Sequence, residues 1–192
     1  MTMKHTHEAG RSMIEMLGVL AIIGVLSVGG IAGYSQAMSK YKVSKTTDQV
    51  QTMVTNIRTL FAGQRTYAGL TAENAYTMGI LTDETWDGAS ASNAYGGSIL
   101  LNTANNDHYF VITYNGLSRD ACTRISMSDW GDSSSGLVGL NVTGSEQDDS
   151  KAKAGTTNFE TADGDLPLKL TDAVDACKGD TDNNAAISWV YR

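Results

Sequence analysis

The sequence predicts an α+β protein in which one long N-terminal helix is followed by a head built partly from antiparallel strands. Two observations lead to this fold class. An apolar stretch near the start runs without a proline into a helical stripe of apolar residues, and the rest of the 192-residue chain carries short aliphatic and aromatic runs separated by turn residues. With 41% hydrophobic residues, the composition is that of a folded protein.

The long helix is predicted from Arg11 to Ala62. Met16 to Ser39 carries no charge, and Met13 to Ala32 has the length of a membrane-spanning helix, about 20 residues. Beyond Ser39, mostly apolar positions recur every three or four residues, as on one face of an amphipathic helix. These positions are Val43, Thr47, Val50, Val54, Ile57 and Phe61. Gly63 is expected to end the helix in the left-handed conformation.

An acid, Glu15, stands where the apolar stretch begins. A carboxylate in the membrane costs about 2.5–3.5 kcal/mol on insertion scales, so such an acid is a functional hypothesis by default. Gly29 and Gly33 form a G-x-x-x-G pair, and small residues of this kind let two helices approach closely in lipid. The segment therefore predicts association between helices, and a plain membrane anchor is the alternative.

The head is predicted to contain short helices and strands joined by polar turns. Helices are expected at 72–78, 118–127 and 170–177, and strands at 98–102, 108–114, 137–143 and 186–191. In the last strand, Ile187, Trp189 and Tyr191 alternate onto one face. The polar stretch 144–165 is predicted to be a surface loop.

The two cysteines, Cys122 and Cys177, both lie in the head. If the head lies outside the cytoplasm, an oxidising compartment favours a disulfide between them. Closing so long a loop would stabilise the fold by about 4 kcal/mol in the chain-entropy model. Two buried thiols are the alternative.

The sequence contains few of the residues that catalysis, metal binding or nucleic-acid binding would need. A net charge of −7 argues against nucleic acid as a general partner. Only His108 lies outside the first ten residues, and no catalytic or phosphate-binding motif is present, so we expect neither an enzyme nor a cofactor. Asp180, Asp182 and Asn184 begin like a calcium loop, but Ala185 follows where such a loop has glycine. We expect no metal there, and calcium at these three residues is the alternative.

The stretch from Gly10 to Glu15 and its apolar continuation resemble the processing site and N-terminal helix of type IV prepilins. In the head, Ala94–Ile99, Leu117–Cys122 and Leu170–Cys177 are similar to the type IVb branch of that family. The resemblance implies that a prepilin peptidase removes residues 1–10 as a leader, by cutting between Gly10 and Arg11, and methylates the new N-terminus. Arg11 stands where the family usually has Phe, Met or Leu.

The resemblance also implies a pilin fold and its domain organisation. Residues 11–38 would form a protruding hydrophobic half-helix that first spans the membrane and then drives assembly. Residues 39–63 would form an amphipathic half packed on the antiparallel sheet, and residues 64–192 the head with its disulfide-bounded region.

The implied function is that of a major pilin. Copies held in the inner membrane would be polymerised by an assembly platform into an extracellular filament for adhesion, aggregation or conjugation. Within it, Glu15 would meet the N-terminal amine of a neighbouring copy, and Gly29 and Gly33 would let the helices pack. One alternative is a type II secretion pseudopilin or a minor pilin. Another is a singly anchored envelope binding protein.

Overall fold

The computed structural model describes residues 9–179 and 181–192, with side chains from Met13 onward. The chain divides into two compact units, residues 1–41 and residues 42–192. Helix α1 (Ala9–Phe61) begins in the first unit and ends in the second without a break. The second unit contains this last part of α1 and a six-stranded antiparallel sheet. The predicted fold class, α+β with a long N-terminal helix and an antiparallel sheet, is confirmed.

The apolar stripe predicted for the second half of α1 forms the helix face that packs in the head. Val50, Val54, Ile57 and Phe61 are all buried and belong to the main core. The helix ends at Phe61, and its last turn is closed by the amide of Gln64, which donates to the Phe61 carbonyl at 2.9 Å. The prediction of a left-handed Gly63 was wrong, because this tighter turn ends the helix with Gly63 at negative φ.

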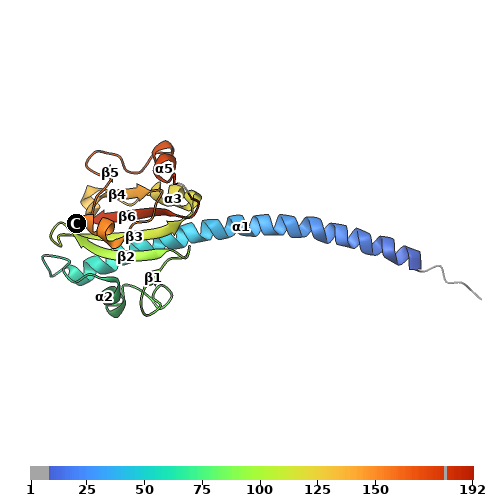
Figure 1. Cartoon of the computed structure of the whole chain (residues 1–192), viewed down its shortest axis with the longest axis horizontal. Helices are drawn as coiled ribbons and strands as arrows, with labels where there is room; N and C mark the ends of the chain where they lie inside the picture. The colour runs from blue at the N-terminus through green and yellow to red at the C-terminus, as the bar shows by residue number, and fades with distance from the viewer. Residues whose placement is uncertain (1–8, 180) are drawn as a thin grey trace, which may run out of the picture. The chain divides into compact units, whose positions relative to one another are not determined.

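The sheet places the last strand of the chain in its interior. Its strands lie in the order β1-β2-β3-β6-β4-β5, and every neighbouring pair is antiparallel. Figure 1 shows the C-terminal strand between its two long neighbours. The strands are β1 (Ala91–Ser92), β2 (Ser98–Ala104), β3 (Tyr109–Leu117), β4 (Leu137–Thr143), β5 (Phe159–Glu160) and β6 (Ala185–Tyr191).

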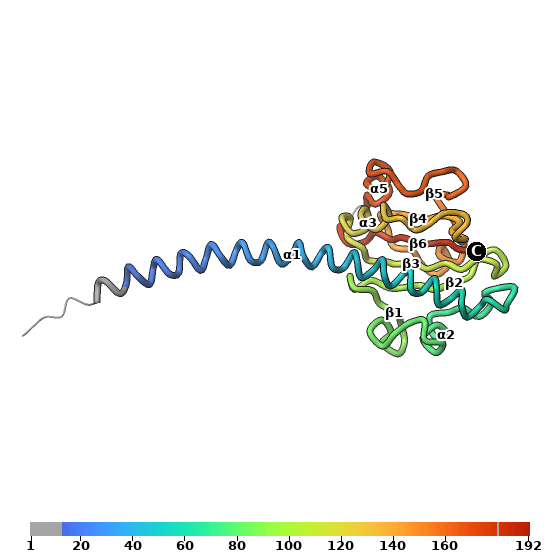
Figure 2. Tube along the Cα trace, turned by 180° about the vertical axis from the view of Figure 1, so that it is seen from behind, coloured from blue at the N-terminus to red at the C-terminus, as the bar shows by residue number. Residues whose placement is uncertain are grey.

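The main core lies between the second half of α1 and one face of the sheet (Figure 2). The strands contribute mainly aromatic and branched side chains, and the Phe110 and Tyr191 rings stack at 5.3 Å. The alternation predicted for β6 is confirmed, since Ile187, Trp189 and Tyr191 all enter this core. The residues between them, Ser188 and Val190, are buried as well. Val190 packs with Ala104 and Val111 on the opposite face, where helix α4 (Asp149–Ala154) contacts β2 and β3.

The other helices lie around the sheet. They are α2 (Ala72–Thr77), α3 (Arg119–Ser126), the 3₁₀ turn η1 (Ser133–Ser135) and α5 (Leu170–Ala176). Thr71 and Ser118 are the N-caps of α2 and α3, since the side chain of each accepts a hydrogen bond from a backbone amide of the first turn.

The prediction of a surface loop over 144–165 was wrong. The segment forms α4 and the short strand β5. Asp148 caps α4 by accepting a hydrogen bond from the Lys151 amide at 2.9 Å. The helix escaped detection because Ala152 is its one buried residue, so no apolar periodicity marks it.

Candidate assembly site

The first unit presents an apolar helix surface that nothing in that unit covers. The side chains of Met13, Leu17, Val25 and Ile31 are each about two-thirds or more exposed. In the described part of the chain, one helix, over Met13–Phe61, is long and apolar enough to cross a membrane, and its most apolar window of 18 residues has a mean hydropathy of 2.2. Apolar surface of this extent is stabilised by lipid or by other protein, at about 25 cal/mol per Å² buried.

Glu15 lies in this apolar helix with its side chain exposed. Gly29 and Gly33 lie one turn apart further along it, and a Cβ atom added at either position would meet nothing within 4 Å. The helix surface at the two glycines is therefore open to a second helix. Nothing in the described structure pairs with the acid or fills this surface, so both roles remain predictions.

The processing site falls at the margin of the described residues. The backbones of Gly10 and Arg11 belong to α1, but the Arg11 side chain lies outside the described part, as do residues 1–8 of the expected leader. Cleavage and methylation are therefore predictions.

The calcium candidate lies partly outside the described residues, because Asp180 is not among them. The Asp182 carboxylate lies 3.8 Å from the Arg119 guanidinium, which also donates to the Gly179 carbonyl at 3.1 Å. Among the described residues, no three His, Cys, Asp or Glu side chains gather as a metal site. A guanidinium beside Asp182 disfavours a second cation there.

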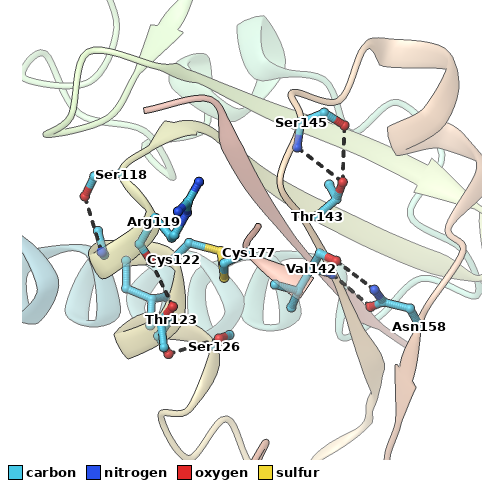
Figure 3. The surroundings of a disulfide bond; sticks show 12 residues. Ser118, Arg119, Cys122, Thr123, Ser126, Val142, Thr143, Ser145, Asn158 and Cys177 are labelled. Carbon is cyan, nitrogen blue, oxygen red and sulfur yellow. Dashed lines mark hydrogen bonds between the residues drawn. A yellow bond between two sulfur atoms is a disulfide. The ribbon is translucent and has the colours of Figure 1, made fainter. Parts of the chain in front are cut away.

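The two cysteines form a disulfide that joins α3 to the end of α5 (Figure 3). The Cα atoms of Cys122 and Cys177 are 5.9 Å apart, and both residues are buried. Of the two alternatives that the sequence left open, the disulfide is therefore confirmed. It closes a segment that contains β4, α4 and β5 and connects α3 with the helix that precedes β6.

Three cations of α1 hold the head against the helix. The Lys42 ammonium lies 5.3 Å from the centre of the Tyr95 ring, and Lys45 forms an ion pair with Glu84. Near the helix end, the Arg58 guanidinium lies 5.1 Å from the centre of the Tyr191 ring. The sequence did not reveal these contacts, because each joins residues far apart in the chain.

Burial raises the pKa of Tyr191 to about 12, although the nearby Arg58 opposes the shift. The folded state therefore favours the neutral phenol, and its contribution to stability is complete below the ordinary tyrosine pKa of about 10. As pH rises from about 10 to about 12, we expect a loss of about 2–3 kcal/mol, at about 1.4 kcal/mol per pKa unit. Urea unfolding between pH 9 and 12 measures it.

The Tyr191→Phe variant should lose less stability over this range, because phenylalanine has no proton to release. Tyr34→Phe, which changes an exposed ring in the first unit, is the matched control. The same slope in all three proteins would contradict the prediction.

Two solved structures share this arrangement of a long helix and an antiparallel sheet. A type IVb pilin from Salmonella typhi superposes with a TM-score of 0.53 at 19% identity, over 78% of this chain and 99% of its own. TcpA, a type IV pilin from the Vibrio cholerae El Tor biotype, superposes with a TM-score of 0.54 at 14% identity, over 79% and 99%. The fold is therefore that of a type IV pilin, as predicted.

Residues 40–191 match the family described as PilS N-terminal, and the chain belongs to that family. Two relatives are each named major structural subunit of bundle-forming pilus. The protein of Escherichia coli O127:H6 (strain E2348/69 / EPEC) is 27% identical over 146 residues, which are 74% of this chain and 75% of the relative. The protein of Escherichia coli O111:H- is 27% identical over 144 residues, or 73% and 74%.

Proposed function

We propose that this protein is the major subunit of an extracellular type IV pilus and that the filament is a polymer of this chain. The observation that carries the proposal is the uncovered apolar helix of the first unit, attached to a folded head with a pilin fold. Two relatives named as major pilus subunits favour a major over a minor role. A structural subunit needs no catalytic site, which agrees with a sequence in which we found no catalytic or phosphate-binding motif.

Before assembly, the subunit would be held in the inner membrane. Residues 11–38 would span the bilayer after a prepilin peptidase removes residues 1–10 and methylates the amine of Arg11. An assembly platform would then transfer the helix from lipid into a bundle of neighbouring helices, with residues 39–63 and the head at 64–192 outside the membrane. Gly29 and Gly33 would allow close helix contacts.

Glu15 would be buried within this bundle. An unpaired charge is costly there, so the acid needs a cation. The proposed partner is the N-terminal amine of an adjacent copy. The pair would fix the register of successive subunits, because a slip of one position would leave two charges unmatched.

The test of this function is electron microscopy of material sheared from the surface of cells that express the chain with a type IV assembly system. We expect long filaments that bind antibody against this head. Filaments that lack the chain, or carry it at the tip alone, would favour a minor pilin or a secretion pseudopilin. Chain that stays monomeric in the membrane would favour an anchored envelope protein.

The Gly10→Val variant is expected to block processing, because this peptidase requires a small residue before the cut in the family that the sequence resembles. The uncut chain should migrate on a gel as a precursor longer by the leader, and the cells should lack filaments. Gly18→Ala, within the apolar segment, is the control and should be cut normally. Normal cleavage of the Gly10→Val variant would contradict the assignment.

A further inference from the structure

The two sides of the sheet differ in how far the backbone groups of the outer long strands, β4 and β2, are already hydrogen-bonded. At the β4 edge, the Asn158 side chain accepts a hydrogen bond from the Val142 amide at 2.9 Å and donates to its carbonyl at 2.7 Å (Figure 3). Further along, the Thr161 amide donates to the Val138 carbonyl, and β5 pairs with Gly139 and Leu140. The backbone groups of β4 between Val138 and Val142 are therefore already bonded on this side, and no further strand can be added to β4 there.

The opposite edge is open over half of β2. The short strand β1 pairs with β2 at Ser98 and Ile99, and the described residues contain no strand beyond it. The Asn93 amide donates to the Gly97 carbonyl at 2.9 Å. Because alternate residues of an antiparallel strand turn their backbone groups to the same side, Leu101 and Thr103 direct theirs to this open edge.

A groove of about 380 Å³ follows this edge along Ser98–Thr103. Leu70, Thr71, Ala72 and Trp86 line it together with Asp149 and Lys153 of α4. The edge is recessed, since Leu101 and Asn102 are 4% and 5% exposed. The edge of a second sheet would bring with it the layer packed on that sheet, at a spacing of about 10 Å, and would be too thick for the groove. A single extended chain fits.

Asn102 supplies a polar group that lacks a partner. It lines the groove, and its Nδ2 atom is buried without a hydrogen bond in the described structure. An unsatisfied buried donor costs about 1–3 kcal/mol. A peptide chain in the groove would offer carbonyl oxygens at this point, and it would also meet the backbone groups of Leu101 and Thr103.

The two charges on α4 give the groove a direction. Gln147, just before α4, bonds the Asn115 side chain, which also bonds Ser98 at the start of β2. Gly155, just after α4, packs on Ala104 at the end of β2. Helix α4 therefore runs parallel to β2, so Asp149 lies toward the start of the strand and Lys153 toward its end.

The spacing of these charges suits a strand. Four residues of a helix rise about 6 Å, and two residues of a strand about 6.8 Å. Side chains two apart on one face of an inserted strand would therefore lie beside Asp149 and Lys153. In a strand antiparallel to β2, as β1 is, the earlier residue would lie beside Lys153.

We propose that this groove binds an extended peptide segment of another protein, added antiparallel to β2, with an acidic residue beside Lys153 and a basic residue two positions later beside Asp149. Backbone hydrogen bonds to Leu101 and Thr103 supply affinity, and the two charges select the sequence, as in other strand-addition sites. The site does not depend on filament assembly, because every residue that forms it belongs to one head.

The test uses the full chain in detergent micelles and two capped fluorescent peptides of equal composition, TTVEVKTT and TTVKVETT. Fluorescence anisotropy should show about five- to tenfold tighter binding of the Glu-x-Lys order, since reversal turns two ion pairs into two repulsions. Hydrogen exchange should be fast at the Leu101 and Thr103 amides of the free chain and slow when this peptide is bound.

Variants separate recognition from nonspecific binding. Exchanging the charges by Asp149→Lys with Lys153→Asp should invert the preference between the peptides. Asp120→Arg with Arg124→Asp, an exchange of the same spacing on α3, should leave it unchanged. Equal binding of both peptides to the parent chain would overturn the proposal, as would Leu101 and Thr103 amides that are already protected without peptide.

Discussion

Replacement of Glu15 by glutamine is expected to abolish filaments while leaving membrane insertion intact. Glutamine has the size of glutamate but no charge, so the amine of a neighbouring subunit would be buried without its partner. Breaking a buried pair in this way costs about 3–5 kcal/mol, which is about 100- to 1,000-fold or more in a subunit addition constant. Insertion should persist, because a neutral residue enters lipid more easily than an acid.

The measurement compares sheared filament yield with the amount of chain in the membrane fraction. Asp48→Asn, which neutralises an exposed acid on the second half of α1, is the matched control and should assemble normally. A normal filament yield from Glu15→Gln would refute the pair, whereas loss of chain from the membrane would point to an anchoring role for the acid.

Arg11 makes it possible to ask which cation meets Glu15. After cleavage, this residue would carry both the new α-amine and a guanidinium, whereas Phe, Met or Leu at this position in the family has the amine alone. If the amine is the partner, Arg11→Met should still form filaments, because its amine remains. Loss of filaments from a correctly cleaved Arg11→Met chain would assign the role to the guanidinium.

The sequence predicted those parts of the fold in which burial follows a simple period. The α1 stripe from Val50 to Phe61 and the alternation in β6 were found because each buried face repeats along one element. It missed α4 and β5, since a helix with one buried alanine and a strand of two residues carry no period.

The candidate sites divide in the same way. Glu15, Gly10 and the two glycines of the apolar segment stand out because a charge or a small residue interrupts a uniform background. The groove at β2 was invisible, because it combines the backbone of Leu101 and Thr103 with charges about 50 residues later that α4 brings alongside. The disulfide was intermediate, since its pairing depends on the compartment as well as on the fold.

Removal of the disulfide is expected to have the largest effect on the stability of the head. The cysteines are 55 positions apart, and closing such a loop is worth about 4 kcal/mol in the chain-entropy model. Typical domains have a total unfolding free energy of about 5–15 kcal/mol. The Cys122→Ala, Cys177→Ala double variant should therefore lose a large part of its stability without placing a new polar group in the core.

The topology explains why removal of the disulfide should destabilise the whole sheet. Strand β4 lies inside the closed segment and pairs with β6, which follows it. Without the disulfide, the segment has more conformational entropy in the unfolded chain, and this entropy must be lost when β4 pairs with β6.

Urea unfolding of the full chain in micelles, followed by tryptophan fluorescence, measures the difference. Ser126→Ala, a small change at a buried site of α3, is the control at about 1 kcal/mol. The expected loss in the free energy of unfolding is about 4 kcal/mol. A double variant within about 1 kcal/mol of the parent would show that native contacts, and not the covalent closure, hold α3 and α5 together.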